Sequence, residues 1–189
     1  TRATSRRNRG LDRRGVAAVA SSCGGKGSRA VASYSEDTTT LAVAAARRAV
    51  GVDDGGVRGR FFSTPTPAYL KKTTATAIHA ALRLDRGVPA YDLNGSVRSG
   101  LAALRMALGI YAPTLVVTSD LRGGLPGGAD ESSSGDGAAA AVVGPGDGVA
   151  SLLSWTSVTD EFLDRWRIPG APAARSWEER FGEIEYVEC

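Results

Sequence analysis

Apolar residues along the chain recur in two patterns, one typical of α-helices and one typical of β-strands, as in an α/β protein. Three stretches carry apolar residues at helical intervals, and short apolar runs bounded by glycine, proline or polar residues alternate with them. Helices are expected at 36–50, with Ser35 as N-cap, and at 71–84 and 95–108; strands are expected at 57–63, 88–93, 113–119 and 136–143. This alternation predicts a layered sheet with helices packed on it.

The two ends of the chain have weaker patterns. The expected elements there are a weak strand at 16–20, a strand at 149–157 that forms a hairpin with 136–143 through the turn at 145–148, an amphipathic helix at 159–168 and a short helix at 177–181. Phe162, Leu163 and Trp166 would form the apolar face of the first of these helices, and Pro169 ends it.

The composition is that of one ordinary domain with a core of its own. The chain has 189 residues, of which 42% are hydrophobic and 23% charged. Cys23 and Cys189 lie far apart in the sequence, so two free thiols are expected, with no metal site. There is no apolar run long enough for a membrane span and no secretory signal pattern, and a cytoplasmic location is therefore expected.

The positive net charge of +3 belongs to the first residues of the chain. Six arginines precede residue 16 beside the single acid Asp12, and without them the remaining chain has 17 bases and 19 acids. We interpret residues 1–27 as a basic leader. It is either an arm that contacts nucleic acid or an acidic partner, or a solvated end, and the lack of interleaved aromatic residues favours the solvated end.

The segment from Ala90 to Gly100 combines the end of a strand, a turn at Asn94 and the start of a helix. A side chain near position 97 would lie at the N-terminus of that helix, where unpaired N–H groups and the helix dipole favour a thiolate over a thiol. A cysteine there would be an activated nucleophile. The residue is Val97.

This turn, taken with other segments, resembles the condensing enzymes of the thiolase superfamily, in the branch of 3-hydroxy-3-methylglutaryl-CoA (HMG-CoA) synthase and ketoacyl synthase III. The similar segments are 28–38 with 41–49, 61–74, 118–122 with Glu131, and the most specific one, 135–144. The resemblance covers nearly everything after Gly27. It implies an α/β, thiolase-like layered fold: one half, a mixed five-stranded sheet with helices, of the pseudo-duplicated αβαβα architecture.

The same resemblance divides the chain into three parts. Residues 1–27 are a basic leader that matches the family poorly, 28–157 form the N-terminal thiolase-like half, and 158–189 form a helical excursion towards a second half that this sequence does not contain. In the family the second half supplies a histidine and an asparagine that assist condensation. We therefore expect half of a split enzyme, a fragment, or the product of an altered reading frame.

In the family an acyl group passes from a thioester to the helix cysteine, and a second thioester then attacks it in a Claisen condensation. Val97 occupies the nucleophile position and has no group that could accept an acyl chain. Ser96 and Ser99 flank it, but neighbouring positions of a helix point elsewhere, so capping is the favoured role of both. Thr64 aligns with the glutamate acid/base of the synthases, and a threonine hydroxyl does not titrate near neutral pH.

Three single residues and one three-residue motif are further candidates for a role. His79, the sole histidine, is expected to be structural. Gly135, Asp136 and Gly137 precede a strand and lack the lysine of a phosphate loop, so they are interpreted as a structural motif in which glycine allows close approach of the backbone. Arg98 and Lys26 are candidates for substrate binding, Lys26 through a coenzyme A phosphate, although a flexible leader loop is the favoured interpretation of the segment around Lys26.

Three hypotheses for function follow. The first is a non-catalytic subunit of an acyl-CoA-dependent acyltransferase or condensing assembly. The second is an active condensing enzyme that acts through a substitute residue or a partner chain, and the third is a nucleic-acid-binding module. The resemblance favours the first, with an acyl-CoA or acyl carrier protein thioester as the family's substrate and no bound cofactor. It implies a homodimer or a hetero-oligomer with a thiolase-like chain and an oligonucleotide-binding-fold subunit, without nucleic acid or membrane.

Overall fold

The computed structural model describes residues 3–6, 9–12, 28–51, 56–125, 128, 130–131, 134–161, 163 and 165–177. Its elements in chain order are β1 (Ala3–Arg6), β2 (Arg9–Asp12), β3 (Ser28–Val31), α2 (Thr38–Val50), β4 (Gly59–Thr64), α3 (Thr74–Leu82), β5 (Ala90–Asn94), α4 (Ser99–Leu108), β6 (Thr114–Asp120), β7 (Gly137–Val143), β8 (Arg165–Trp166) and β9 (Arg175–Ser176).

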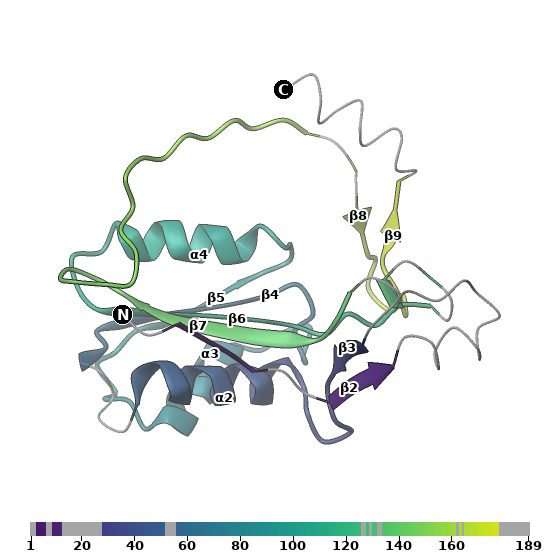
Figure 1. Cartoon of the computed structure of the whole chain (residues 1–189), viewed down its shortest axis with the longest axis horizontal. Coiled ribbons are helices and arrows are strands. Elements are labelled where there is room, and N and C mark those ends of the chain that lie inside the picture. The colour runs from purple at the N-terminus through teal and green to yellow at the C-terminus, as the bar shows by residue number, and fades with distance from the viewer. Residues whose placement is uncertain are drawn as a thin grey trace.

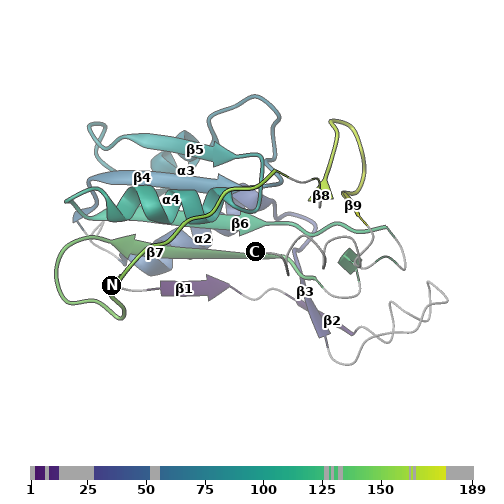
Figure 2. The ribbon, with the colours of Figure 1, turned by 90° about the horizontal axis from the view of Figure 1, so that it is seen from above.

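Five strands form one mixed sheet in the order β1-β7-β6-β4-β5. Strand β4 runs parallel to β5 and β6, whereas β7 is antiparallel to both β6 and β1. The pairs β2–β3 and β8–β9 form separate small ladders at one end of this sheet (Figure 2). The predicted α/β fold with a mixed five-stranded sheet is confirmed.

Helices lie on both faces of the sheet, with α2 and α3 on one face and, among the described elements, α4 on the other (Figure 1). Adjacent residues of a strand point to opposite faces, and the two apolar clusters follow this rule. Phe62 and Val117 pack towards α2 and α3, whereas Phe61 and Val116 pack towards α4. The core beneath α2 and α3 is the larger of the two.

Helix α2 begins two residues later than the sequence pattern predicted. Asp37, not Ser35, is its N-cap: the Asp37 carboxylate accepts a hydrogen bond from the Thr40 amide at 2.7 Å, and the Thr40 hydroxyl accepts one from the Asp37 amide at 2.8 Å. The preceding acid, Glu36, instead accepts hydrogen bonds from the amide and hydroxyl of Ser33. A reciprocal capping box of this kind fixes where the helix starts.

Part of the expected basic leader belongs to the sheet. Residues Ala3–Arg6 pair with Ala138–Ala141 as the edge strand β1, and Arg9–Asp12 pair with β3. These polar segments have no apolar alternation, so their pairing depends on distant strands and leaves no local signal in the sequence. The weak strand expected at 16–20 lies outside the described residues.

The end of the chain also differs from the prediction. Residues 149–157 form no strand, so the turn at 145–148 leads into an extended arm and not into a hairpin. The described residues of 159–168 are not helical, and Arg165–Trp166 pairs with Arg175–Ser176 across the proline-rich turn. The short helix expected at 177–181 lies beyond the described residues, apart from Trp177.

Among the described residues, every helix is too short or too polar to cross a bilayer.

Candidate active-site pocket

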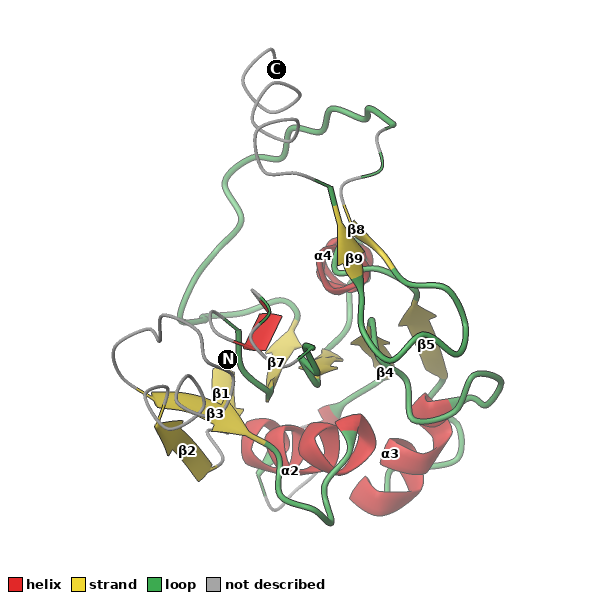
Figure 3. Cartoon of the chain, turned by 90° about the vertical axis from the view of Figure 1, so that its right-hand side faces the viewer, coloured by secondary structure: helices red, strands yellow, loops and turns green. Residues whose placement is uncertain are grey.

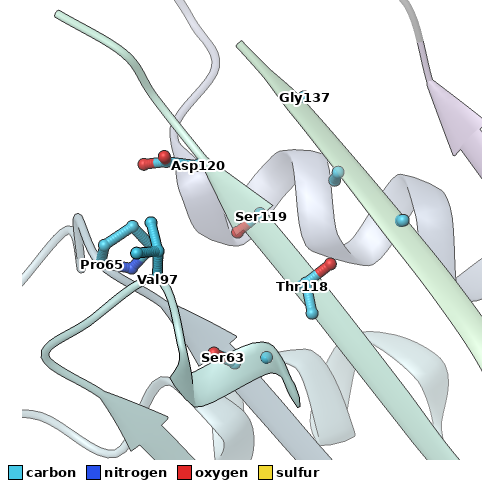
Figure 4. A pocket seen from close by; sticks show the side chains of 10 residues that line it. Ser63, Pro65, Val97, Thr118, Ser119, Asp120 and Gly137 are labelled. Atoms are coloured by element: carbon cyan, nitrogen blue, oxygen red, sulfur yellow. The ribbon is translucent and has the colours of Figure 1, made fainter. Parts of the chain in front are cut away.

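An open pocket of about 490 Å³ lies where β4 and β6 end, β7 begins and α4 starts (Figure 4). It is lined by Ser63, Pro65, Val97, Gly100, Thr118, Ser119, Asp120, Gly137, Ala138 and Ala139. The parallel strands β4 and β6 both present their carboxyl ends here, and ligands of α/β proteins bind preferentially at such edges. The pocket is therefore the candidate active site.

Val97 lies at the position that the sequence predicted, in the turn between β5 and α4 and against the pocket (Figure 4). Val97 is 59% exposed, and its aliphatic side chain lines the pocket. Arg98 occupies the N-cap of α4 without a side-chain cap hydrogen bond, and the first amide of the helix, that of Ser99, donates to the Ser96 carbonyl at 3.2 Å.

Ser96 and Ser99 interact with each other instead of lining the pocket. The Ser96 amide donates to the Ser99 hydroxyl at 3.4 Å, and the two hydroxyl oxygens are 3.4 Å apart. These contacts stand at the start of α4, where side-chain oxygens typically satisfy unpaired amides. Gly100 lies in the first turn of the helix, where a β-carbon would meet the Thr118 methyl group at 3.2 Å.

Thr64 is fully buried at the end of β4 and does not line the pocket. Its hydroxyl accepts a hydrogen bond from the Thr66 amide at 3.1 Å. The preceding residue, Ser63, faces the pocket in its place. The end of β4 thus offers hydroxyl groups but no carboxylate.

Asp120 is a pocket residue that the sequence did not single out as a site. It is the one carboxylate among the lining residues. One of its oxygens accepts a hydrogen bond from the Thr66 hydroxyl at 2.8 Å, and the other pairs with the Arg122 guanidinium. Its place at the last position of β6, directly after Thr118 and Ser119, is the signal that could have marked it.

The Gly135–Gly137 motif connects the pocket wall to strand β3. A β-carbon at Gly135 would lie 3.2 Å from the Ala30 carbonyl oxygen, so the backbones approach closely there. The Asp136 carboxylate accepts hydrogen bonds from the amides of Ala32 at 2.8 Å and Arg122 at 2.7 Å. Asp136 therefore ties together three chain segments that lie far apart in the sequence.

The other candidates lie away from the pocket lining. The His79 ring nitrogen Nε2 is 3.0 Å from the Asp85 carbonyl oxygen, at the end of α3. Arg98 is exposed next to Val97 but does not line the pocket, and Lys26 lies outside the described residues. No cluster of three or more histidine, cysteine or acidic side chains in the described ranges could hold a metal ion.

A pair of opposite charges lies between β4, β5 and α3. Arg60 is fully buried, and none of its three guanidinium nitrogens has a hydrogen-bond partner. Asp92 accepts a hydrogen bond from the Ala75 amide at 2.9 Å, at the start of α3, while its second oxygen has no partner. Burial lowers the pKa of Arg60 to about 10, against the opposing effect of Asp92, and burial raises the pKa of Asp92.

A cysteine introduced at position 97 is expected to be an activated thiol. With Val97→Cys the thiol would lie at the amino end of α4, so its pKa should fall and it should react with iodoacetamide about three times faster at pH 7 than an ordinary exposed thiol. Val149→Cys, in the exposed arm after β7, is the matched control. The rates are measured by mass spectrometry at each site. Equal rates at 97 and 149 would show that the turn does not activate a nucleophile.

Comparisons with known proteins agree with the sequence resemblance. The HMG-CoA synthase of Aeropyrum pernix is 36% identical over 168 residues, which are 84% of this chain and 46% of the relative. The HMG-CoA synthase of Methanocella arvoryzae is 32% identical over 167 residues, which are 85% of this chain and 48% of the relative. The chain thus spans about half the length of the curated relatives that it matches. No protein-family profile matches the sequence.

Two solved structures likewise match this chain over about half of their own length. An HMG-CoA synthase complexed with CoA superposes with a TM-score of 0.83 at 18% identity, over 98% of this chain and 52% of that structure. The β-ketoacyl-acyl carrier protein synthase III of Thermus thermophilus superposes with a TM-score of 0.64 at 25% identity, over 76% of this chain and 50% of that structure. The described fold is one half of these larger architectures.

Proposed function

We propose that this chain, which belongs to the thiolase superfamily in the branch of HMG-CoA synthase and ketoacyl synthase III-like condensing enzymes, is a non-catalytic subunit of an acyl-CoA-dependent acyltransferase or condensing assembly. The observation that carries the proposal is Val97. It lies against the pocket at the helix start where the family resemblance places the nucleophile, and its side chain cannot accept an acyl group.

The acid/base position supports the same proposal independently. Thr64, which aligns with the glutamate of the synthases, is buried and hydrogen-bonded to the Thr66 amide. A threonine hydroxyl does not ionise near neutral pH, so it cannot replace the glutamate as a general acid or base. Two separate steps of a Claisen condensation, acyl transfer and proton transfer, would therefore depend on groups from another chain.

The assembly that we propose contains a thiolase-like companion chain that carries the nucleophile. Its substrate would be a thioester of coenzyme A or of an acyl carrier protein, and no resident cofactor is needed. An oligonucleotide-binding-fold subunit is a further proposed member, and a homodimer of this chain is the alternative association. We propose no nucleic-acid or membrane partner.

The alternative function is an active condensing enzyme that works through a substitute residue or a partner chain. It is favoured by the pocket itself, which keeps a hydroxyl at Ser63 and a carboxylate at Asp120 on the walls beside Val97. Asp120 is already engaged by Thr66 and Arg122, so proton transfer through it would require these contacts to break. The non-catalytic role therefore has the stronger support.

Intact-mass analysis of the native assembly after incubation with acetyl-CoA tests the proposal. All chains are separated under denaturing conditions, and the mass of each is compared with that of an untreated sample. We expect an added acetyl group on a companion chain and none on this one. An acetyl group on this chain would overturn the proposal, and the modified residue, mapped by peptide mass spectrometry, would identify the substitute nucleophile.

A further inference from the structure

The segment 165–176 lies at the same end of the sheet as the candidate active-site pocket. Its two short strands, β8 and β9, stand beyond the start of α4, at the end to which β4 and β6 point (Figures 1 and 3). Arg165 in β8 donates two hydrogen bonds to the Asp130 carboxylate, at 2.9 Å to Oδ1 and at 2.6 Å to Oδ2. A bidentate pair of this kind combines opposite charge with a fixed geometry. It ties β8 to the loop that connects β6 to β7.

Asp130 lies near two further arginines. The pKa of Asp130 is below its usual range, chiefly because Arg165 donates hydrogen bonds to it. Burial opposes this shift, and the positive charges of Arg165, Arg122 and Arg29 add to it. Only 16% of the Asp130 side chain is exposed, so loss of Arg165 would leave a largely buried carboxylate that attracts another cation.

Of these two neighbours, Arg122 is the one placed to move. Arg29 is 8% exposed, and its guanidinium donates to the carbonyl oxygens of Glu131 at 2.9 Å and Arg122 at 3.0 Å. The main chain of Arg122 is fixed, because its amide donates to Asp136 and its carbonyl accepts from Arg29. Its side chain is 24% exposed and pairs with Asp120, the carboxylate of the pocket. Arg122 thus stands between the carboxylate of the pocket and the carboxylate that holds β8.

We propose that the Arg122 side chain exchanges between two carboxylates, Asp120 in the pocket and Asp130 in the loop, according to whether Arg165 is docked on Asp130. While Arg165 is docked, Arg122 neutralises Asp120. When the segment 165–176 departs, Arg122 turns to Asp130 and leaves an uncompensated negative charge on the pocket wall. The position of β8 and β9 therefore sets the charge that a ligand meets in the pocket. This inference goes beyond the proposed function and does not depend on it.

The two ion pairs are balanced closely enough for such an exchange. Between 16% and 31% of each of their four side chains is exposed, and partly exposed pairs contribute little to stability, so neither arrangement is locked. The coupling is also reciprocal. A ligand with a negative group next to Asp120 would favour the docked segment, because an unpaired carboxylate there would repel that group.

A thiol in the pocket can report this change of charge. Val97 and Asp120 line the same pocket, so Val97→Cys in the full chain places a thiol beside the carboxylate (Figure 4). Iodoacetate is negatively charged and iodoacetamide is neutral, so the ratio of their reaction rates reports the electrostatic potential at the thiol, and the thiolate fraction cancels. We expect Arg165→Gln to lower this ratio about two- to fivefold at low salt. Arg167→Gln removes an exposed charge from the same segment and should change the ratio by less than about 1.5-fold.

Two further variants decide whether the effect passes through Asp120. When Asp120→Asn is also present, Arg165→Gln should no longer change the ratio. Arg165→Lys retains a cation next to Asp130, so it should keep the ratio of the Val97→Cys chain. An unchanged ratio in Arg165→Gln would overturn the proposal. An equal decrease with and without Asp120→Asn would overturn it as well, because the lost charge would then act directly on the reagent. Circular dichroism checks that each variant keeps the fold.

Discussion

Replacement of Asp92 by alanine is expected to lower the free energy of unfolding of the full chain by about 3 kcal/mol at pH 7. Two losses combine. The Ala75 amide at the start of α3 loses its acceptor, and the N-cap residue Thr73 makes no side-chain hydrogen bond that could replace it. In addition, the buried Arg60 loses the carboxylate that offsets its charge. Urea unfolding followed by circular dichroism measures the effect.

The matched variants separate the two losses. Asp92→Asn keeps an acceptor for the Ala75 amide and removes a charge that burial disfavours, so it should cost less than half as much as Asp92→Ala. The double variant Arg60→Met with Asp92→Asn replaces both charges, including a guanidinium with no hydrogen-bond partner, and it should raise the free energy of unfolding above that of Asp92→Asn by about 1–3 kcal/mol. A double variant less stable than Asp92→Asn would contradict this account of the pair.

The pH dependence gives an independent check of the same pair. Burial raises the pKa of Asp92, so the folded state binds this proton more readily than the unfolded state does. Stability from this group is therefore gained as the pH falls from 7 through the folded pKa, and lost as the pH rises again. The difference in free energy of unfolding between the natural chain and Asp92→Asn should move in favour of the natural chain over that interval. A constant difference would contradict the direction of the shift.

The sequence predicted the parts of the fold that local patterns encode. Strand β4 lies within two residues of the expected range, because its apolar residues are buried on both faces of the sheet. Helix α4 ends where expected but begins at Ser99, four residues later than predicted, and it buries Ala103 and Ala107 while Leu101 and Met106 stay exposed. The end of β4 and the start of β7 also bring Ser63 and Gly137 to the same pocket. This part of the candidate site follows from strand order once the fold is recognised.

The features that were missed depend on residues far away in the chain. Strand β1 is polar and pairs with the open edge of β7, while 149–157 has a strand-like sequence but pairs with no strand among the described residues. Asp120 lines the pocket because it ends β6, which its sequence position could have indicated, whereas its contacts with Thr66 and Arg122 join residues that no sequence spacing brings together. Pairing partners, and not propensities, decided these cases.

The second large effect is expected at Asp136. Asp136→Ala should lower the free energy of unfolding of the full chain by about 3–5 kcal/mol, because it leaves the amides of Ala32 and Arg122 without an acceptor. It also removes the Asp136 carboxylate, which lies 3.8 Å from the guanidinium of Arg29, a residue only 8% exposed. Asp147→Ala, an exposed acid in the turn after β7, is the control and should change the value by less than about 0.5 kcal/mol.

Hydrogen exchange locates the effect of Asp136→Ala. The amides of Ala32 and Arg122 should lose most of their protection against exchange. Amides in the centre of β6 should exchange only through global unfolding, so their protection should fall only as far as the free energy of unfolding does. Asp136→Asn retains one acceptor oxygen and should protect one of the two amides. Because Arg122 also pairs with Asp120, loss of the Asp136 contact should loosen the wall of the pocket next to Val97. Unchanged exchange at both amides would show that Asp136 does not hold these segments together, and the role of the 135–137 motif would then rest on its glycines alone.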